Sequence, residues 1–212
     1  MRHRVLNGQH IVITDDMTGK MVGMNSLNTS AECNPFCTKM RATKGYICQS
    51  CYSKSTERRW KYSQAAWANN FDVLSSRVLA DQEIPIINSA IFRFQAHGDL
   101  VNRTHYINLV RFAEANQQTT FALWTKHMDV VNNGGLVRVK NLINIYSTPV
   151  LNDLHPIRPK GFSKVFTVYS RPFTREHKSV KVNCAASCLE CQKCYQHNGI
   201  TRINEHIKQT GK

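Results

Sequence analysis

The segment "AIFRFQAHGDLVNRTHYINLVRFAEANQQTTFALWTK", residues 90–126, indicates the fold class because a helical pattern separates two short apolar runs. It predicts three elements: a strand at Ala90–Phe94, a helix at Arg103–Gln118 and a strand at Thr120–Thr125. Within the helix, Tyr106, Val110 and Ala113 recur at helical spacing and should face inward. A strand, a helix and a second strand in this order predict parallel strands joined by a right-handed crossover.

Upstream of this unit, residues 9–27 predict a strand, a turn at Asp15-Asp16 and a second extended piece. The longest predicted helix runs from Ser53 to about Leu79. Large apolar residues recur along it at intervals of three, four and seven: Trp60, Trp67, Phe71, Leu74 and Val78.

Downstream, a brief helix is predicted near His127–Asn133, and two further strands at Leu142–Ser147 and Lys164–Ser170. Gly134-Gly135 follows a helix rather than a strand, so it predicts a helix stop and not a phosphate loop. About four or five strand–helix units fit this length, too few for a closed eight-stranded barrel. We therefore expect an α/β fold, either a partial (β/α) barrel or a parallel sheet, with N- and C-terminal cysteine-rich metal-binding segments.

The composition is that of a folded chain. Its 212 residues are 42% hydrophobic, which argues against wholesale disorder and predicts one domain. We expect that domain to comprise N-terminal strands and a cysteine loop (1–53), a βα core (54–175) and a C-terminal cysteine cluster (176–212). No apolar run approaches the roughly 20 residues of a membrane-spanning helix, and the N-terminus lacks a secretory signal, so a cytoplasmic protein without membrane contact is expected.

The net charge of +14 is concentrated at the two ends of the chain. Residues 1–62 carry ten Lys and Arg against four Asp and Glu, and residues 151–212 carry eleven against four, whereas the middle is nearly balanced. Such a basic field suits a polyanionic partner, a nucleic acid or a nucleotide. It is also compatible with a solvated surface or an anionic small substrate.

Eight cysteines form two groups. They are Cys33, Cys37, Cys48 and Cys51, then Cys184, Cys188, Cys191 and Cys194. In a reducing compartment metal binding is the expected reason for them. The second group has the spacing C-x3-C-x2-C-x2-C, which resembles ferredoxin-type ligation and favours an iron–sulfur cluster, with zinc as the alternative metal.

The first group leaves several ligand sets open. It could be a zinc knuckle pair, or it could hold a cluster through Cys48, Cys51 and one of Cys33 or Cys37. The two groups could also meet in space and share ligands. The sequence does not decide among these arrangements.

The carboxyl ends of the predicted strands carry polar residues, which should surround one mouth if the strands are parallel. These residues are Arg93, His97, Gly98, Asp99, Thr125, Lys126, Tyr146, Ser147, Tyr169, Ser170 and Arg171. Polar residues are also common at strand ends because loops are exposed to solvent, which is the simpler explanation for the tyrosines and serines. Arg93 lies inside an apolar strand and needs a carboxylate, with Asp99 the nearest candidate, or an anionic ligand.

Five stretches occur in the order of a known family: "GYICQSCYS", "FRFQAHGDLVNRTHYINLVRFAEAN", "FALWTK", "NLINIYS" and a terminal C-x2-C-x2-C before an aromatic residue. From about Met24 to Tyr195 the chain thus resembles an uncharacterised bacteriophage protein family with two cysteine clusters. Onto this sequence the resemblance places the motif residues Cys48, Cys51, Tyr52, Arg93, Gly98, Asp99, Thr125, Lys126, Ser147, Cys188, Cys191 and Cys194. Phe94, His97 and Trp124 depart from the family pattern.

That family is distantly similar to the radical S-adenosylmethionine (SAM) superfamily. The resemblance implies a [4Fe–4S] cluster held by three cysteines, SAM bound through its amino and carboxylate groups, and a radical that abstracts hydrogen from the substrate. The superfamily's usual spacing, Cys-x3-Cys-x2-Cys, occurs here only at Cys184–Cys188–Cys191, at the other end of the chain. The terminal four cysteines would then hold an auxiliary cluster or zinc.

The polar residues at the strand ends, taken together with this resemblance, give the candidate site residues. The catalytic candidates are Arg93, His97, Asp99 and Lys126, and the cofactor-binding candidates are Tyr52, Gly98, Asp99, Thr125 and Ser147. The expected function is a radical-SAM-like enzyme that modifies nucleic acid or a nucleotide, in the host cytoplasm if the gene is a phage gene. The alternatives are a non-catalytic zinc protein that binds nucleic acid, and a protein whose function lies on a protein-binding surface.

Overall fold

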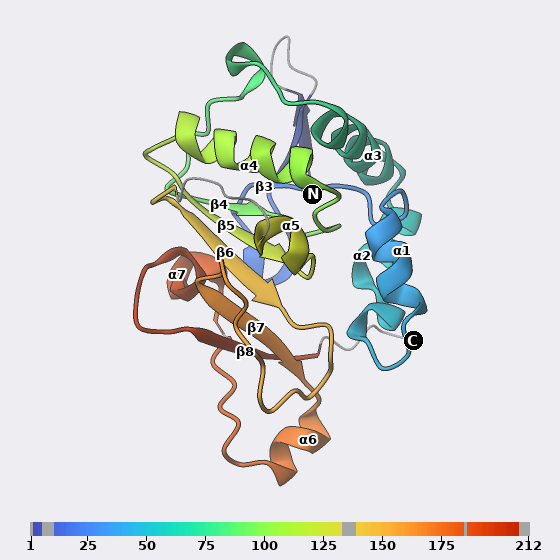
Figure 1. Cartoon of the computed structure of the whole chain (residues 1–212), viewed down its shortest axis with the longest axis vertical. Helices are drawn as coiled ribbons and strands as arrows, with labels where there is room; N and C mark the ends of the chain where they lie inside the picture. Colours follow the sequence, from blue (N-terminus) through green and yellow to red (C-terminus); the bar gives the residue numbers. More distant parts are fainter. Residues whose placement is uncertain (1, 6–10, 133–138, 185, 208–212) are drawn as a thin grey trace.

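The computed structural model describes residues 2–5, 11–132, 139–184 and 186–207, and its centre is one mixed β-sheet (Figure 1). In this part of the chain the strand order follows the sequence from β1 to β8. The strands are β1 (Arg2–Val5), β2 (Val12–Asp15), β3 (Ser26–Leu27), β4 (Ile91–Phe94), β5 (Thr120–Thr125), β6 (Leu142–Ser147), β7 (Lys164–Tyr169) and β8 (Arg202–His206).

The sheet is antiparallel from β1 to β3 and parallel from β3 to β8. In the parallel part Phe92 of β4 pairs with Phe121 of β5, and Phe121 pairs with Leu142 of β6. Parallel strands that neighbour one another in chain order are the arrangement of a (β/α) barrel. Because β1 and β8 are the two ends of the strand order and do not pair with each other, the sheet has the topology of a partial barrel and not of a closed one. The predicted α/β class is confirmed.

The two longest helices lie on one face of the sheet (Figure 1). The described helices are α1 (Pro35–Ala42), α2 (Tyr52–Arg59), α3 (Lys61–Ser76), α4 (Arg103–Ala115), α5 (Met128–Asn132), α6 (Arg171–Glu176) and α7 (Cys188–Cys191). Helix α4 packs beside α3 and α5, and α3 also packs against β1 and β2. Short 3-10 turns add η1 (Gly19–Met21), η2 (Ile47–Ser50), η3 (Asp81–Glu83) and η4 (Lys193–Tyr195).

Alternation along the strands gives the sheet two different faces, since successive side chains of a strand point in opposite directions. Phe92, Phe94, Phe121 and Leu123 belong to the core under the helices, where the rings of Phe94 and Phe121 stack with centroids 4.8 Å apart. The opposite, inner face has its own apolar cluster, formed by Ile91, Ala122, Trp124, Ile143 and Ile145 with Met17, Met21, Met24 and Tyr195. The inner face is therefore covered by the segment after β2 and by the C-terminal cysteine segment.

Most predicted bounds in the βα core are confirmed. Strands β5 and β6 have the expected ends, and helix α4 begins at Arg103 as predicted. It ends at Ala115 rather than Gln118, because the Asn116 side chain accepts a hydrogen bond from the backbone N–H of Ile87 and donates to Pro85 O. The side chains of Tyr106, Val110 and Ala113 are buried as expected.

The single helix predicted from Ser53 to Leu79 is wrong, because two helices occupy this stretch. The backbone at Trp60 is extended, with φ −120° and ψ 94°, so α2 ends there and α3 begins at Lys61. Trp67 and Leu74 lie in the core, whereas Trp60 and Val78 are exposed. The apolar spacing holds only within α3; in α2 the inward positions are Ser53 and Glu57.

The sequence patterns missed the outer strands β1 and β8. Strand β8 (RINEH) is polar and is ordered by pairing with β7 from Val165↔Arg202 to Tyr169↔His206. The predicted stop at Gly134-Gly135 lies outside the described residues, and the single-domain division stays a prediction. Among the described helices, none combines the length and apolar character needed to cross a bilayer.

Candidate active site

A cavity of about 670 Å³ opens on the inner face of the sheet. Five of the eleven residues expected at the predicted mouth line it, and His97, Thr125, Tyr146, Tyr169, Ser170 and Arg171 do not. The lining includes these five, Tyr52 and thiols from both cysteine groups: Arg93, Gly98, Asp99, Lys126, Ser147, Tyr52, Cys37, Cys48, Cys51, Cys184, Cys188 and Cys194. The carboxyl ends of parallel strands meet at one edge of the sheet, which brings these distant residues together.

The N-terminal cysteine loop presents three of its four thiols to this cavity. Cys37 lies on α1, Cys48 lies in η2, and Cys51 precedes the first turn of α2; all three line the cavity. The Asn34 side chain starts α1 by accepting from Phe36 N, and its amide donates to Asp99 O at 3.0 Å, which ties the loop to the end of β4. Cys33 is exposed and is not among the lining residues.

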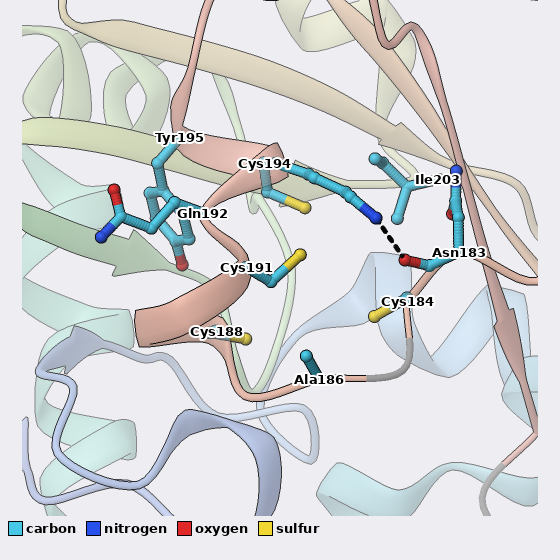
Figure 2. Close-up of a pocket in the computed structure, with 10 residues that line it drawn as sticks. Asn183, Cys184, Ala186, Cys188, Cys191, Gln192, Cys194, Tyr195 and Ile203 are labelled. Atoms are coloured by element: carbon cyan, nitrogen blue, oxygen red, sulfur yellow. Dashed lines mark hydrogen bonds between the residues drawn. The ribbon is translucent and has the colours of Figure 1, made fainter.

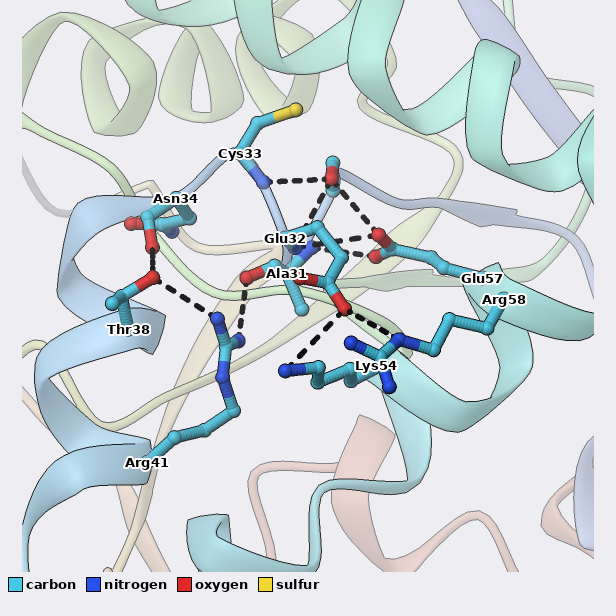
Figure 3. A network of polar contacts seen from close by, with 10 residues as sticks. Ala31, Glu32, Cys33, Asn34, Thr38, Arg41, Lys54, Glu57 and Arg58 are labelled. Atoms are coloured by element: carbon cyan, nitrogen blue, oxygen red, sulfur yellow. Dashed lines mark hydrogen bonds and ion pairs between the residues drawn. The ribbon is translucent and has the colours of Figure 1, made fainter.

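A buried carboxylate holds the start of this loop in place (Figure 3). Glu57 of α2 accepts hydrogen bonds from the backbone N–H of Ala31 at 2.6 Å and of Glu32 at 3.3 Å, and from Ser30 Oγ at 2.9 Å. Burial raises the Glu57 pKa, and these donors oppose the rise. The Glu57 side chain, at a buried position of α2, therefore anchors the loop to this helix.

Asp99 is fixed in one orientation at the cavity wall. Its carboxylate accepts from the backbone N–H of Leu100 at 2.8 Å and of Lys126 at 3.1 Å, and from the hydroxyl of Thr125. Burial raises the Asp99 pKa, while the Lys126 ammonium and the donors oppose that rise. Thr125, predicted to bind the cofactor, is not a lining residue and instead supports Asp99 from behind.

Lys126 faces the cavity between the strand ends and the N-terminal thiols. Its ammonium donates to Ser147 Oγ at 3.0 Å. Burial disfavours the charge, but the neighbouring acidic groups, with Cys48 and Asp99 first among them, oppose burial, and the Lys126 pKa is raised. Lys126 thus places a positive charge where it can compensate the negative charge of thiolates or of an anionic ligand.

Gly98 is required by the turn that carries Asp99. Its φ of +78° lies in the left-handed region, and a Cβ built there would be 2.2 Å from Thr29 O. A side chain at this position would meet backbone, which cannot yield as a flexible side chain can. The predicted Gly98 is therefore a packing requirement of the cavity wall.

His97, predicted as a catalytic residue, is not among the cavity-lining residues. Its ring stacks on Trp67 with centroids 4.3 Å apart and meets the edge of Tyr52 at 5.3 Å. Its backbone N–H donates to Asn28 Oδ1 at 2.9 Å. The structure places His97 in an aromatic stack, where it supports the end of β4.

Arg93 does not pair with Asp99, contrary to the expectation from the sequence. Among the described residues no carboxylate lies within ion-pair distance of its guanidinium, whose Cζ lies 3.7 Å from the centroid of the Trp124 ring. Its Nε is buried without a hydrogen-bond partner. Burial raises the pKa values of Cys188 and Cys194, and the positive charge of Arg93 opposes this rise.

The C-terminal cysteines surround a small hollow of about 20 Å³ (Figure 2). Cys188 and Cys191 begin and end α7, and Gln192 adopts a left-handed conformation with φ 46°, which turns the chain so that Cys194 faces the same hollow. Cys184, in the segment between α6 and α7, closes it. Burial, with smaller contributions from the three neighbouring thiols, raises the pKa of Cys194 to about 12 although Arg93 opposes the rise.

Each set of thiols interacts within itself. Burial raises the pKa of Cys37, with smaller contributions from Asp99 and from its own group's Cys51 and Cys48. Burial also raises the pKa of Cys184, with smaller contributions from Glu205 and from its own group's Cys188 and Cys191. The structure thus separates two thiol groups that open on one cavity. Within the described part of the chain, no set of three or more His, Cys, Asp and Glu side chains is arranged as a metal site, so metal binding stays a prediction.

The sequence patterns missed Lys20 and Glu205, which join the two ends of the chain at the cavity. The Lys20 ammonium donates to Glu205 Oε1 at 2.7 Å and lies 3.8 Å from Cys184 Sγ. Both residues line the cavity. Neither lies in a recognisable motif, because they come from η1 and β8, which are far apart both in the sequence and in the strand order and meet only in the folded chain.

The fold and cavity define an α/β protein with an open, partial-barrel sheet whose inner face carries two groups of thiols. The chain belongs to the Gene product 88 family, whose family model matches residues 13–191. This match supports the predicted relationship to a family of phage proteins and covers both cysteine groups except Cys194. No curated protein and no solved structure matches the chain.

Proposed function

We propose that this phage-family protein is an iron–sulfur enzyme of radical-SAM-like type that acts on nucleic acid or a nucleotide. The observation that carries the proposal is the convergence of three thiols with Arg93, Asp99 and Lys126 on one cavity. A volume of about 670 Å³ lies within the range of pockets that enclose cofactors and small substrates. Titratable groups with shifted pKa values in such a pocket are typical of catalytic sites.

The N-terminal thiols that line the cavity would supply three protein ligands to a cluster. Cys37, Cys48 and Cys51 line the cavity, and the exposed Cys33 is not among its lining residues. Three thiolates on a four-iron cluster leave one iron open to a ligand. When bound, such a cluster supplies the electron that cleaves SAM reductively and so starts hydrogen abstraction from the substrate.

The protein's own side chains would orient the ligands. Asp99, held by its three donors, offers a fixed carboxylate for an amino group, and Ser147 with Lys126 offers donors for a carboxylate. Arg93 offers an unpaired guanidinium to a phosphate or another anion. We infer that anionic substrate binds on the Arg93 side of the cavity, between the two thiol groups.

The C-terminal four-thiol group suits a single zinc ion or an auxiliary cluster. Its hollow of about 20 Å³ is of the size that holds one water molecule, which favours one ion. This observation also supports a second candidate function, a non-catalytic zinc protein that binds nucleic acid through its +14 charge. The two candidates differ in the metal that the N-terminal group binds.

The test is metal and acid-labile sulfide content with an absorption spectrum, on protein purified without oxygen. We expect iron with sulfide and a broad band at roughly 400 nm, as thiolate-bound clusters show. Cys37→Ser should lose this iron, whereas Cys33→Ser, the matched control in the same loop, should keep it. Zinc alone after anaerobic reconstitution with iron and sulfide would exclude the enzyme and leave the zinc protein.

A further inference from the structure

Five consecutive residues at the break between α2 and α3 are exposed, and two of them are aromatic. This α2–α3 patch consists of Arg58, Arg59, Trp60, Lys61 and Tyr62. Trp60 is 56% exposed and Tyr62 is 88% exposed. The extended backbone at Trp60 interrupts the helix at this point and leaves both rings outside the core.

The exposure of these rings is unusual within this chain. The other two tryptophans, Trp67 and Trp124, are buried. Within the part of the chain that the structure describes, neither Trp60 nor Tyr62 makes a ring contact. Exposed aromatic faces without protein partners are available to stack on a flat ligand.

The surroundings of the rings are positively charged. Lys54 and Arg58 reach Glu32 at 3.8 and 3.4 Å (Figure 3), so their charge is partly compensated. Arg59 and Lys61, on either side of Trp60, have no ion-pair partner among the described residues. Two free cations beside two free rings give the combination that single-stranded nucleic acid requires, since its phosphates need cations and its unpaired bases need flat partners.

The patch is joined to the cavity by one short helix. Helix α2 starts at Tyr52, which lines the cavity, and ends at Arg59, in the patch. Eight residues of α-helix span about 12 Å. A strand bound at the patch can therefore extend along α2 toward the cavity mouth.

We propose that the α2–α3 patch docks single-stranded nucleic acid, with bases stacked on Trp60 and Tyr62 and phosphates bound by Arg59 and Lys61. The inference deepens the proposed function by choosing a polynucleotide over a free nucleotide, and it rests on that function only for the role of the bound strand as substrate. The docking itself requires no cluster. The docking of nucleic acid can therefore be tested independently of the iron content.

The test is binding of a fluorescein-labelled oligothymidylate of about 16 nucleotides to the full chain, measured by anisotropy. Trp60→Ala should weaken binding at least about tenfold, and Trp60→Phe should restore most of it, because a ring is enough for stacking. Arg59→Ala/Lys61→Ala should reduce the slope of log K against log salt by about 1.4, as for two lost phosphate contacts. The matched control, Arg175→Ala/Lys178→Ala, removes two exposed cations at and just beyond the end of α6.

Tryptophan fluorescence gives a second readout. The oligothymidylate should quench the emission of the wild-type protein, and Trp60→Phe should abolish that quenching while it keeps binding. Three outcomes would overturn the proposal: no binding by the wild-type protein, equal binding by Trp60→Ala and wild type, or equal binding of a duplex of the same length. Loss of binding in Trp60→Ala in a protein that holds only zinc would sustain the docking surface and reject the iron–sulfur enzyme. Iron and sulfide in a protein whose patch variants bind normally would reject the docking surface and sustain the iron–sulfur enzyme.

Discussion

The guanidinium carbon of Arg93 lies 3.7 Å from the centroid of the Trp124 ring, on the inner face of the sheet. Ring and cation come from neighbouring parallel strands, β4 and β5. The stack holds a positive charge in the cavity where no carboxylate of the described chain neutralises it. An arginine held in this way is prepared to bind an anion, since its donors need no rearrangement.

Arg93→Met should separate the anion-binding role of this residue from its role in stability. We expect the free energy of unfolding to stay within about 1 kcal/mol of wild type, because the lost cation–π contact is offset by removal of a partly buried, unpaired charge. Inorganic phosphate at constant ionic strength should raise the Tm of wild type but not of the variant. Arg77→Met, which removes an exposed arginine paired with Glu83, should keep the response. A phosphate response retained by Arg93→Met would contradict the assignment.

Gly98→Ala should destabilise the fold by about 3 kcal/mol or more, because a Cβ would meet Thr29 O in addition to the strain of a positive φ. Gly19→Ala is the matched control. Gly19 also has a positive φ, +65°, but nothing lies within 4 Å of its built Cβ, so only the conformational cost of about 1–2 kcal/mol applies. Equal losses for the two variants in urea unfolding would show that the contact with Thr29 costs nothing.

Stability should fall below neutral pH because of His105. This residue of α4 is fully buried, and burial lowers its pKa to about 3. The unfolded chain takes up a proton near pH 6.5 and the folded chain only near pH 3, so stability is lost as pH falls through this window. The loss from this group is about 2 kcal/mol between pH 7.5 and 5.

Urea unfolding of His105→Asn measures this contribution. Between pH 7.5 and 5 the free energy of unfolding should fall by about 2 kcal/mol less in the variant than in wild type, because asparagine does not titrate. His155→Asn, at an exposed position, serves as the control and should keep the wild-type difference. An unchanged pH dependence in His105→Asn would assign the acid sensitivity to other groups.

Glu57→Ala should lower the free energy of unfolding by about 3 kcal/mol. The carboxylate accepts hydrogen bonds from the backbone N–H groups of Ala31 and Glu32. Without it these N–H groups have lost their acceptor, which costs free energy. Glu114→Ala, at an exposed position of α4, should change stability by no more than about 0.5 kcal/mol. If the protein binds iron as proposed, Glu57→Ala should also lower iron content at a temperature where it is folded, since the loop before Cys37 loses its anchor.

Local patterns were sufficient for the βα core. Apolar runs of strand length gave β5 and β6 their correct ends, and helical spacing gave the start of α4, because these elements are stabilised by the faces that their own residues bury. The same reasoning failed at Trp60, where a large apolar residue at helical spacing lies outside the core. It also failed for β8, whose polar residues are ordered by pairing with β7 rather than by their own pattern.

The sequence by itself determined the α/β class, the two cysteine groups and the polar residues that follow the strands, since each depends on residues close together in the chain. Only the tertiary structure decided which of these residues meet. It brought Cys37, Cys48 and Cys51 to the cavity and left Cys33 outside it, and it gave Arg93 an aromatic partner in place of Asp99. Spacing along the chain carries no information on contacts between distant segments, whereas the pairing of the strands and the packing of the loops and helices that follow them fix these contacts.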